Sequence, residues 1–467
     1  MELPHMNPSD FRAHAHALVD WMADYLEQVG TMPIVPDVQP GDILRRIPAG
    51  PPEQGEPFAA LFDDFKRIIV PGMAHWQHPG WFAYFPANYS PPSLLAEMLT
   101  ASLGAQCMSW VTSPAATELE QVMMTWLRDM CGLPGCFTGV IQDTASTATL
   151  VAILTARQRA IDAGADPGRL VLYTSPEAHS SVPKGARLAG FPADRVRLIA
   201  TDQAFALDPA ALAAAMEADT AAGLVPACVV ATVGTTSSTA IDPLAPIAAI
   251  CRRHGAWLHV DAAYAGCAAI LPECRHHFAG VEEADSFVFN PHKWLFVHFD
   301  CSAYFVRDVD ALQRTFSASP EYLKAAHDRV VPNYRDWGIQ LGRRFRALKL
   351  WFVIRSYGVE GLRAMLRDHI ALARAFASWV DAEPGFERVA PVPFGLVCFR
   401  RRVEGRTADD INRRLLAEVN ATRRVHLTGT VLGGQYTLRL SVGQRNTRRE
   451  DVELAWTLIR AAAARVD

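Results

Sequence analysis

The chain has 467 residues, enough for two or three domains or for one large domain with appendages. Half of its residues are hydrophobic, a fifth are charged and the formal net charge is −4, which is the composition of a globular protein with a large core. No basic block accumulates along the sequence, and this argues against nucleic acid as a partner.

The chain ends and the cysteines bear on the cellular compartment. The nine cysteines are scattered without a C-x-x-C pair, so we predict no disulfide framework and expect a reducing compartment. The N-terminus lacks the pattern of a secretory signal, and no apolar run reaches membrane-spanning length, so we expect a cytoplasmic protein with no membrane partner. The histidine pairs His14/His16 and His276/His277 lack helical ligand spacing with a carboxylate, so we predict no metal site.

The first predicted element is an amphipathic helix over residues 9–29, capped by Ser9-Asp10. A connector rich in proline and glycine follows over residues 35–57, and then a second amphipathic helix over residues 59–69. The first helix cannot bury its apolar stripe within such a segment. We therefore expect it to lie on the main domain or on a partner chain.

From about residue 91 to residue 307, helical stretches alternate with short apolar runs rich in β-branched residues. This alternation predicts an α/β fold with a mainly parallel sheet, whose functional site lies at the carboxyl ends of the strands. The predicted strands are residues 170–174, 227–233, 257–260, 286–290 and 302–306, and the predicted helices are residues 94–103, 115–130 and 146–163.

Two further helices and a smaller α/β domain complete the predicted fold. The helices cover residues 342–357 and 361–381. The smaller domain has predicted strands at 395–399, 425–428 and 436–441 and helices at 408–419 and 450–463. We place the boundaries of an N-terminal helical segment, a large domain and a small C-terminal domain at residues 1–90, 91–375 and 376–467.

Two motifs carry the chemistry. Asp261 stands at the carboxyl end of the strand 257–260, where a site carboxylate and a helix N-cap are equally expected. Lys293 follows the next strand. A lysine in apolar surroundings has a lowered pKa and bonds covalently to aldehydes. The alternative interpretation is a lysine at a strand end whose charged head reaches the solvent. Together they fit pyridoxal 5′-phosphate (PLP), which needs a lysine for its aldehyde and a carboxylate facing its pyridine nitrogen.

Two weaker motifs lie after other strands. Residues 142–147 place small hydroxyl residues at the start of a long helix, which suits a phosphate group but is also typical of an ordinary N-cap. His179 follows the strand 170–174, where an imidazole can stack on a cofactor ring and bind a substrate carboxylate. A histidine in a surface loop is the alternative interpretation.

Longer stretches of the sequence match one known family. These are residues 78–86, 113–120, 178–181, 259–266, 290–294 and 341–346. They resemble the group II PLP-dependent decarboxylases, and among these the aromatic-L-amino-acid decarboxylases, from about Asn7 to Asp381. The resemblance implies fold type I of the PLP enzymes and a homodimer with shared active sites, in which residues 1–90 form the dimerisation segment around the partner subunit.

The same resemblance implies roles for individual residues. Lys293 would bond covalently to PLP, Asp261 would face its nitrogen, and His179 would stack on its ring, with the small Ala263 packed beneath. The other implied cofactor-binding residues are Thr144, Ala145, Ser146, Thr236, Asn290, His292 and Phe299.

The reaction is expected to depend on two of these positions. Tyr334, in the loop 325–337, matches a mobile-loop tyrosine that helps to protonate the substrate carbon. In this family, phenylalanine at that position or asparagine at the histidine accompanies oxidative decarboxylation to an aldehyde, so Tyr334 with His179 favours simple decarboxylation to an amine. An aromatic aldehyde synthase is one alternative. A PLP-dependent aminotransferase is another, and it needs an arginine for the substrate carboxylate, for which Arg445 is the candidate.

The expected substrate pocket is apolar and aromatic, which suits tryptophan, tyrosine, phenylalanine or their hydroxylated forms, although core packing is the alternative for each residue. Its predicted members are Trp76, Tyr84, Phe85, Pro86, Met108 and Gly342. Gly342 leaves room for a bulky indole. Because a carboxylate is unfavourable beside a phosphate, we expect Asp143 to turn away from the phosphate cradle, toward the helix N-terminus.

Overall fold

The structure is a computed structural model that describes residues 6–317, 331–403 and 408–466. Its helices are α1 (Pro8–Gln28), α2 (Phe58–Asp64), α3 (Pro91–Leu103), α4 (Pro114–Cys131), α5 (Ala145–Asp162), α6 (Ser181–Leu188), α7 (Pro209–Ala221), α8 (Leu244–His254), α9 (Pro291–Trp294), α10 (Val309–Phe316), α11 (Arg346–Ala382), α12 (Ala408–Ala421) and α13 (Arg449–Val466). Its strands are β1 (Thr138–Gln142), β2 (Leu170–Thr174), β3 (Val196–Leu198), β4 (Val225–Thr232), β5 (Trp257–Asp261), β6 (Ser286–Phe289), β7 (Ser302–Val306), β8 (Phe386–Arg388), β9 (Leu396–Arg401), β10 (Thr428–Leu432) and β11 (Gln435–Ser441).

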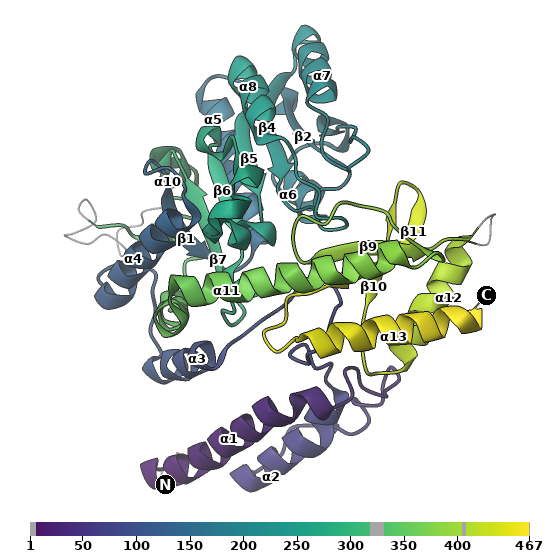
Figure 1. The fold of residues 1–467 in the computed structure, drawn as a ribbon. Helices are drawn as coiled ribbons and strands as arrows, with labels where there is room; N and C mark the ends of the chain where they lie inside the picture. The colour runs from purple at the N-terminus through teal and green to yellow at the C-terminus, as the bar shows by residue number, and fades with distance from the viewer. Residues whose placement is uncertain (1–5, 318–330, 404–407, 467) are drawn as a thin grey trace.

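A seven-stranded sheet of order β1-β7-β6-β5-β4-β2-β3 forms the centre of the larger part (Figure 1). Only β7 runs antiparallel to its neighbours, so the mainly parallel α/β sheet predicted from the sequence is confirmed. Helices cover both faces, and successive residues therefore enter opposite cores. On β5, Trp257 packs in the core with α5, whereas Leu258 and Val260 pack in the core with α4 and α8.

The smaller part is a four-stranded antiparallel sheet of order β10-β11-β9-β8. The long helix α11 runs from beneath the large sheet to the small one, and α12 and α13 complete the small core (Figure 1). Gly358 breaks the helical backbone of α11 with a φ of 65°, a conformation that favours glycine. This break corresponds to the boundary between the two helices predicted over residues 342–381.

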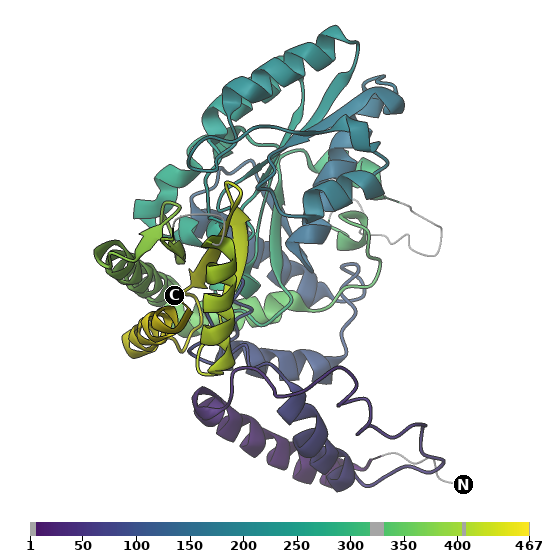
Figure 2. The ribbon, with the colours of Figure 1, turned by 90° about the vertical axis from the view of Figure 1, so that its right-hand side faces the viewer.

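The N-terminal helices α1 and α2 lie side by side and project from the lower end of the molecule (Figures 1 and 2). They contact each other through rings, including Trp21 on Phe65 with centroids 5.0 Å apart, yet neither helix has a fully buried residue. The predicted cap was wrong by two residues. Asn7 is the N-cap, because its side chain accepts the backbone N–H of Asp10 while Pro8 starts the helix.

Two predicted elements were wrong because tertiary contacts outweighed local pattern. Residues 342–345 precede α11 instead of starting it, since buried Arg343 pairs with Glu120 at 2.6 Å. Residues 425–427 lie outside the small sheet, whose strand β10 begins at Thr428. There the backbone of His426 bonds with Gly80 and Phe82, which ties the N-terminal segment to the small sheet.

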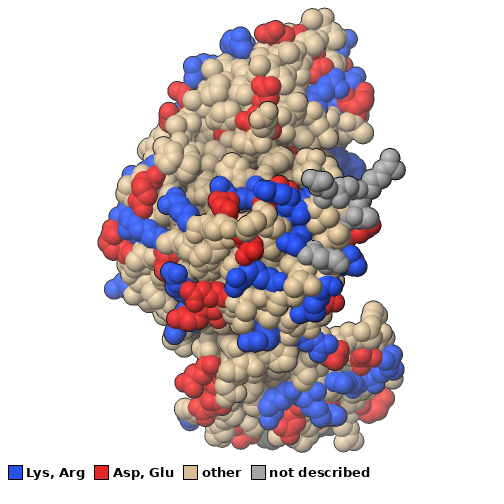
Figure 3. Space-filling view, turned by 45° about the vertical axis from the view of Figure 1, so that its right-hand side comes forward, with Lys and Arg blue, Asp and Glu red and all other residues tan. Residues whose placement is uncertain are grey.

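The surface mixes charges of both signs. In Figure 3, basic and acidic side chains are interspersed over the face shown, without a continuous field of one sign. Within the described part of the chain, no helix is long and apolar enough to cross a membrane.

A buried aromatic pair joins α9 to α11. The Trp294 indole N–H donates to Nδ1 of His369 at 3.0 Å, so the His369 ring is neutral, and burial lowers its pKa to about 4. An unfolded histidine takes up a proton near pH 6.5. Between these two pH values the unfolded chain binds more protons than the folded one, so stability falls as the pH falls.

We therefore expect His369→Gln to flatten the acid limb of the stability profile. Between pH 6.5 and pH 4, the free energy of unfolding should fall in both proteins. The fall should be smaller in the variant by up to about 3 kcal/mol, since glutamine accepts the Trp294 hydrogen bond without titrating. Denaturant unfolding at several pH values measures this. Exposed His276→Gln is the control, and equal pH slopes for both variants would contradict the assignment.

Candidate active site

The carboxyl ends of five strands meet at one edge of the large sheet. β6, β5, β4 and β2 are parallel neighbours, and β1 shares their direction because both β1 and β6 are antiparallel to β7. The predicted site residues that follow these strands are Thr144, Ala145 and Ser146 after β1, His179 after β2, Thr236 after β4, Asp261 and Ala263 after β5, and Asn290, His292 and Lys293 after β6.

Asp261 and Lys293 come from adjacent strands. Asp261 ends β5, is buried, and accepts the backbone N–H of Ala263 at 3.0 Å. Lys293 lies on the short helix α9, where its N–H bonds to Asn290 at 2.9 Å. Burial lowers the pKa of Lys293, while the charge of Asp261 opposes that shift. The lysine therefore spends more time as a free amine than an exposed lysine does.

His179 shares this electrostatic environment. Desolvation lowers its pKa, with Lys293 acting in the same direction and Asp261 opposing. Its Nδ1 accepts the backbone N–H of Ser181 at 3.1 Å. Since a backbone N–H only donates, the neutral ring carries its proton on Nε2. His179 thus offers one N–H donor beside the lysine and the carboxylate.

The N-terminus of α5 provides a site for an anion. Thr144 is the N-cap, and its hydroxyl accepts the N–H of Thr147 at 3.3 Å. The N–H groups of Ala145 and Ser146 have no partner among the described residues, and the Ser146 side chain is exposed. Free N–H groups and the positive end of the helix dipole suit a phosphate.

Asp143 turns away from these free donors, as we predicted. One carboxylate oxygen accepts the N–H of Thr144 at 2.5 Å, at the helix N-terminus. The other accepts the side-chain amide of Gln340 at 2.6 Å. Its negative charge is therefore satisfied by donors other than Ala145 and Ser146.

Asn290 and His292 follow β6, and Asn290 is linked through Ser302 to the end of β1. Asn290 accepts a hydrogen bond from Ser302, which pairs with Gln142 at the end of β1, directly before the N-cap of α5. His292 accepts the backbone N–H of Cys301 on Nδ1 at 2.9 Å, so its proton lies on Nε2. Burial, with help from the charge of Lys293, lowers the pKa of His292 to about 3. His292 is therefore an uncharged donor.

Phe299 is placed close to His292. The two ring centroids are 4.8 Å apart, and Phe299 is half exposed. Its exposed edge leaves it available for contacts that a single chain does not supply.

The segment 76–86 carries several aromatic residues, here called the aromatic wall, and one of its rings lies beside the lysine. The Phe85 ring stacks on Tyr264 at 4.0 Å, and Lys293 Nζ lies 5.6 Å from its centroid. Trp76 stacks on Tyr84 at 5.6 Å, and Tyr84 keeps about half of its surface exposed. Pro86 continues the wall and packs against Gly443, where a Cβ would lie 2.7 Å from the proline ring.

The structure places three predicted site residues in a second group. Met108 lies between α3 and α4, and Tyr334 and Gly342 lie between α10 and α11. The Arg335 N–H bonds to the Met108 carbonyl at 2.9 Å, and Gly342 lies beside Gln106. The Met108 segment and the Tyr334 segment therefore lie next to each other.

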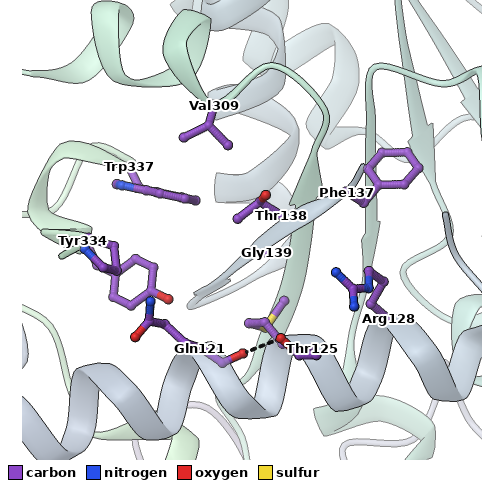
Figure 4. Close-up of a pocket in the computed structure, with 11 residues that line it drawn as sticks. Gln121, Thr125, Arg128, Phe137, Thr138, Gly139, Val309, Tyr334 and Trp337 are labelled. Atoms are coloured by element: carbon purple, nitrogen blue, oxygen red, sulfur yellow. Dashed lines mark hydrogen bonds between the residues drawn. The ribbon is translucent and has the colours of Figure 1, made fainter. Parts of the chain in front are cut away.

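Tyr334 itself is buried, with 3% of its surface exposed. Its ring packs on the guanidinium of Arg343 at 4.7 Å and on Trp337 at 5.3 Å. Burial raises the pKa of Tyr334 well above its ordinary value, with Glu120 adding to the shift. Figure 4 shows Tyr334 bordering a cavity of about 390 Å³ between α4 and β1. Residues 325–330 of its loop lie outside the described residues.

Sequence reasoning missed Arg439. It lies on β11, has 5% of its surface exposed, and its guanidinium is 5.3 Å from the Phe85 centroid. The signal was available, because Arg439 is a single charge between the apolar Leu438 and Leu440. Arg445, the arginine that we had considered for a substrate carboxylate, bonds to Asn88 through its backbone, and its buried Nε has no hydrogen-bond partner among the described residues.

Comparisons with known proteins decide the family. Residues 40–402 match the family described as the pyridoxal-dependent decarboxylase conserved domain. The chain belongs to this family. It is 46% identical to the aromatic-L-amino-acid decarboxylase of Sus scrofa, over 98% of this chain and 97% of that protein. The family that the sequence motifs suggested is thereby confirmed, and this pyridoxal-dependent decarboxylase is a carboxy-lyase of the aromatic-L-amino-acid decarboxylase group.

Two further relatives define the range of activities within this decarboxylase family. The crystal structure of Catharanthus roseus tryptophan decarboxylase in complex with L-tryptophan superposes with a TM-score of 0.95 at 40% identity and covers 100% of both chains. The phenylacetaldehyde synthase of Arabidopsis thaliana is 42% identical over 98% of this chain and 97% of that protein. Family membership therefore leaves the product to be argued from the site.

The cofactor of this pyridoxal-dependent decarboxylase is PLP, and the residues present fit it. A lysine with a lowered pKa stands beside a buried carboxylate, the N-terminus of α5 offers two free backbone N–H groups, and His292 after β6 offers an uncharged imidazole donor. Lys293 would hold the aldehyde, Asp261 the ring nitrogen, and Ala145, Ser146 and His292 the phosphate. In the described part of the chain, no three histidine, cysteine, aspartate or glutamate side chains are arranged to hold a metal ion.

Proposed function

We propose that the protein decarboxylates an aromatic L-amino acid to the aryl-ethylamine and CO2. The observation that carries this proposal is the neutral His179, with its Nε2–H beside Lys293 and Asp261. Such a ring can donate a hydrogen bond to a substrate carboxylate and later serve in proton transfer. The wall formed by Phe85, Tyr84 and Trp76 supports an aromatic side chain as the substrate group.

PLP, when bound, supplies a conjugated ring that accepts the electron pair left by CO2. The chain's own residues prepare this step. Lys293 provides an amine that reacts because its pKa is lowered. Asp261 provides a buried negative charge that stabilises a positive ring nitrogen facing it. The free N–H groups of Ala145 and Ser146 hold the phosphate and so fix the position of the ring.

The aromatic wall assists loss of CO2 by excluding water. A carboxylate beside Phe85 loses hydration, and departure as neutral CO2 relieves that cost. A proton must then return to the substrate carbon. His179 Nε2–H is positioned within the chain for this role, and Tyr334 is the second candidate. Tyr334 is buried against Arg343 and Trp337, and it could serve the site of its own chain or that of a partner subunit.

Two other PLP reactions are the alternatives. An aldehyde synthase is favoured by the 42% identity to a phenylacetaldehyde synthase. An aminotransferase needs an arginine for the substrate carboxylate, and the candidate is Arg445, whose buried Nε has no hydrogen-bond partner among the described residues. The presence of both His179 and Tyr334 supports amine formation over both alternatives.

Product analysis tests this proposal. We expect the PLP-loaded protein to convert tryptophan, tyrosine, phenylalanine or their hydroxylated forms to amine and CO2 in equal amounts, without hydrogen peroxide. Mass spectrometry of products and a coupled peroxide assay, with and without oxygen, measure this. Aldehyde and peroxide as main products would establish the aldehyde synthase instead.

The variants His179→Asn and Tyr334→Phe test the residues behind the product choice. Each is expected to lower the yield of amine and to raise aldehyde and peroxide by roughly tenfold or more, since each removes a proton donor that competes with oxygen for the substrate carbon. Tyr357→Phe, a tyrosine on α11 outside the site, is the matched control. Unchanged product ratios in both site variants would contradict their assigned roles.

We also propose a homodimer with shared active sites, with residues 1–90 as the dimerisation segment, 91–375 as the PLP-binding unit and 376–467 as the small unit. Helices α1 and α2 lack buried residues, and Phe11 is 60% exposed. Helix α3 exposes Leu95, Leu99 and Leu103. Apolar side chains in such numbers favour a protein partner. A partner would also bring the group of Tyr334, Met108 and Gly342 to a neighbouring Lys293.

Mixing two variants that are each impaired in amine formation tests the shared site. Lys293→Ala subunits lack the lysine, and Tyr334→Phe subunits lack the phenol. If Tyr334 serves the partner's site, hybrid dimers contain one complete site, and a re-equilibrated mixture should regain roughly a quarter of the original amine-forming activity per subunit. No gain, with hybrids verified by mass, would place Tyr334 at the site of its own chain.

A further inference from the structure

Arg439 is a buried cation that the catalytic scheme above does not use. It lies on β11, where Leu438 and Leu440 face the small core with α12 and α13. Side chains alternate along a strand, so Arg439 faces the opposite side, toward the turn that follows β4. The small sheet thus extends one charged side chain to the edge where the site residues gather.

The partners of Arg439 are all uncharged. Its Nη2 donates to the Thr236 carbonyl at 2.8 Å, its Nε to the Ser237 carbonyl at 3.0 Å, and its Nη1 to the Thr428 hydroxyl at 3.0 Å. No carboxylate among the described residues forms an ion pair with it, and burial lowers its pKa. A buried guanidinium without a counter-ion is costly, and its hydrogen bonds offset that cost. We call the pair of hydrogen bonds from Nη2 and Nε to the Thr236 and Ser237 carbonyls the fork.

The turn held by this fork carries Thr236. The base of the turn is fixed separately, because buried Asp242 accepts the N–H of Thr232 at 2.7 Å. Nearer the tip, the Ser237 hydroxyl lies 3.1 Å from the Thr430 hydroxyl on β10. The Thr236 side chain itself is exposed at the site edge. Arg439 therefore sets where the tip of the turn lies relative to the strand ends.

Arg439 also contacts the aromatic wall. Its guanidinium lies 5.3 Å from the Phe85 centroid, and Lys293 Nζ lies 5.6 Å from the same centroid. Tyr264 stacks on Phe85 at 4.0 Å. One ring is therefore held by Arg439 and Tyr264 while it borders the reactive lysine. A shift of Arg439 would move both Phe85 and the turn of Thr236.

We propose that Arg439 is a positioning residue of this decarboxylase, which aligns the Thr236 turn and the Phe85 ring over the bound cofactor through its fork to the Thr236 and Ser237 carbonyls. The role rests on the proposed function and adds a residue from the small sheet to it. Arg439 touches neither the cofactor nor the substrate in this role. It acts through Thr236 and Phe85, and misplacement of the reacting groups by about 1 Å is enough to slow an enzyme greatly.

Two substitutions separate geometry from charge. Arg439→Met keeps much of the side-chain length and removes the hydrogen-bond donors. Arg439→Lys keeps the charge, but its ammonium lacks the planar guanidinium that bonds to both carbonyls. We expect both to lower kcat for CO2 release by roughly 10- to 100-fold, with a smaller change in KM. Rescue of kcat by lysine would overturn the role of the fork. Arg400→Met is the matched control, because Arg400 is also buried in the small sheet but pairs with Glu387 and Asp409.

A double-mutant cycle tests whether Arg439 acts through Thr236. If it does, the Arg439→Met loss shrinks when Thr236 is already alanine, whereas independent losses that multiply would overturn the proposal. The visible circular dichroism of bound PLP gives a readout that needs no turnover. It should change in Arg439→Met and Arg439→Lys and stay unchanged in Arg400→Met, with borohydride trapping showing PLP still on Lys293. An unchanged spectrum overturns the positioning role even if the protein proves to have another PLP activity.

Discussion

Lys293→Ala is expected to lower CO2 release from aromatic amino acids by at least about 10³-fold, because no other residue of the site offers an amine. In the unchanged protein, borohydride reduction followed by peptide mass spectrometry should find the cofactor on Lys293. In the variant that peptide should carry none. Single-turnover CO2 release with saturating PLP measures the catalytic loss.

Lys184→Ala is the matched control, since Lys184 is an exposed lysine on α6, which follows β2, another strand of the same sheet. It should keep both the activity and the labelled peptide. A Lys293→Ala protein that retains more than about a tenth of the activity would contradict the assignment, as would PLP trapped on another lysine.

Asp261→Asn should be the second most damaging change. Asparagine keeps the shape and the bond to the Ala263 N–H but removes the buried charge. We expect kcat/KM to fall roughly 10²- to 10³-fold, as when other electrostatic stabilisers are removed. Since Asp261 raises the pKa of both Lys293 and His179, its loss should also shift both pKa values further down. The pH profile of kcat/KM should therefore move toward lower pH.

The control for this variant is Asp208→Asn. Asp208 caps α7 by accepting the N–H of Ala210 at 2.8 Å, and asparagine caps equally well. It should leave kcat/KM and the pH profile unchanged. An Asp261→Asn protein with an unshifted pH profile would contradict the electrostatic role, even if its rate were reduced.

Strands buried on both faces were the most predictable part of the fold. The predicted bounds of β2 and β7 coincide with the observed ones, because each is a short run of apolar residues with polar residues on either side. Strand β1 was missed. It contains Gly139 and Gln142, and it pairs with β7, whose residues follow more than 150 positions later. Its pairing is set by tertiary contacts that local pattern does not reveal.

The candidate site also has a part that the sequence could predict and a part that it could not. Asp261, Lys293 and His179 were predictable, since each follows a recognisable strand and the parallel sheet brings strand ends together. The packing of Tyr334 on Arg343 was not predictable, because it depends on the pair of Arg343 and Glu120, which joins distant segments. Arg439 escaped notice because its partners are backbone carbonyls, which carry no signature in a sequence.

The uncharged state of His292 has a consequence for cofactor retention. With Nδ1 occupied by the Cys301 N–H and a pKa of about 3, this donor keeps the same charge from mildly acidic to alkaline conditions. The backbone N–H groups of Ala145 and Ser146 do not titrate either. The phosphate of PLP has its second ionisation near pH 6. The affinity of these donors for the phosphate therefore changes with the charge of the phosphate and not with the charge of the protein. We therefore expect the protein to prefer the phosphate dianion and to retain PLP less well as the pH falls below about 6.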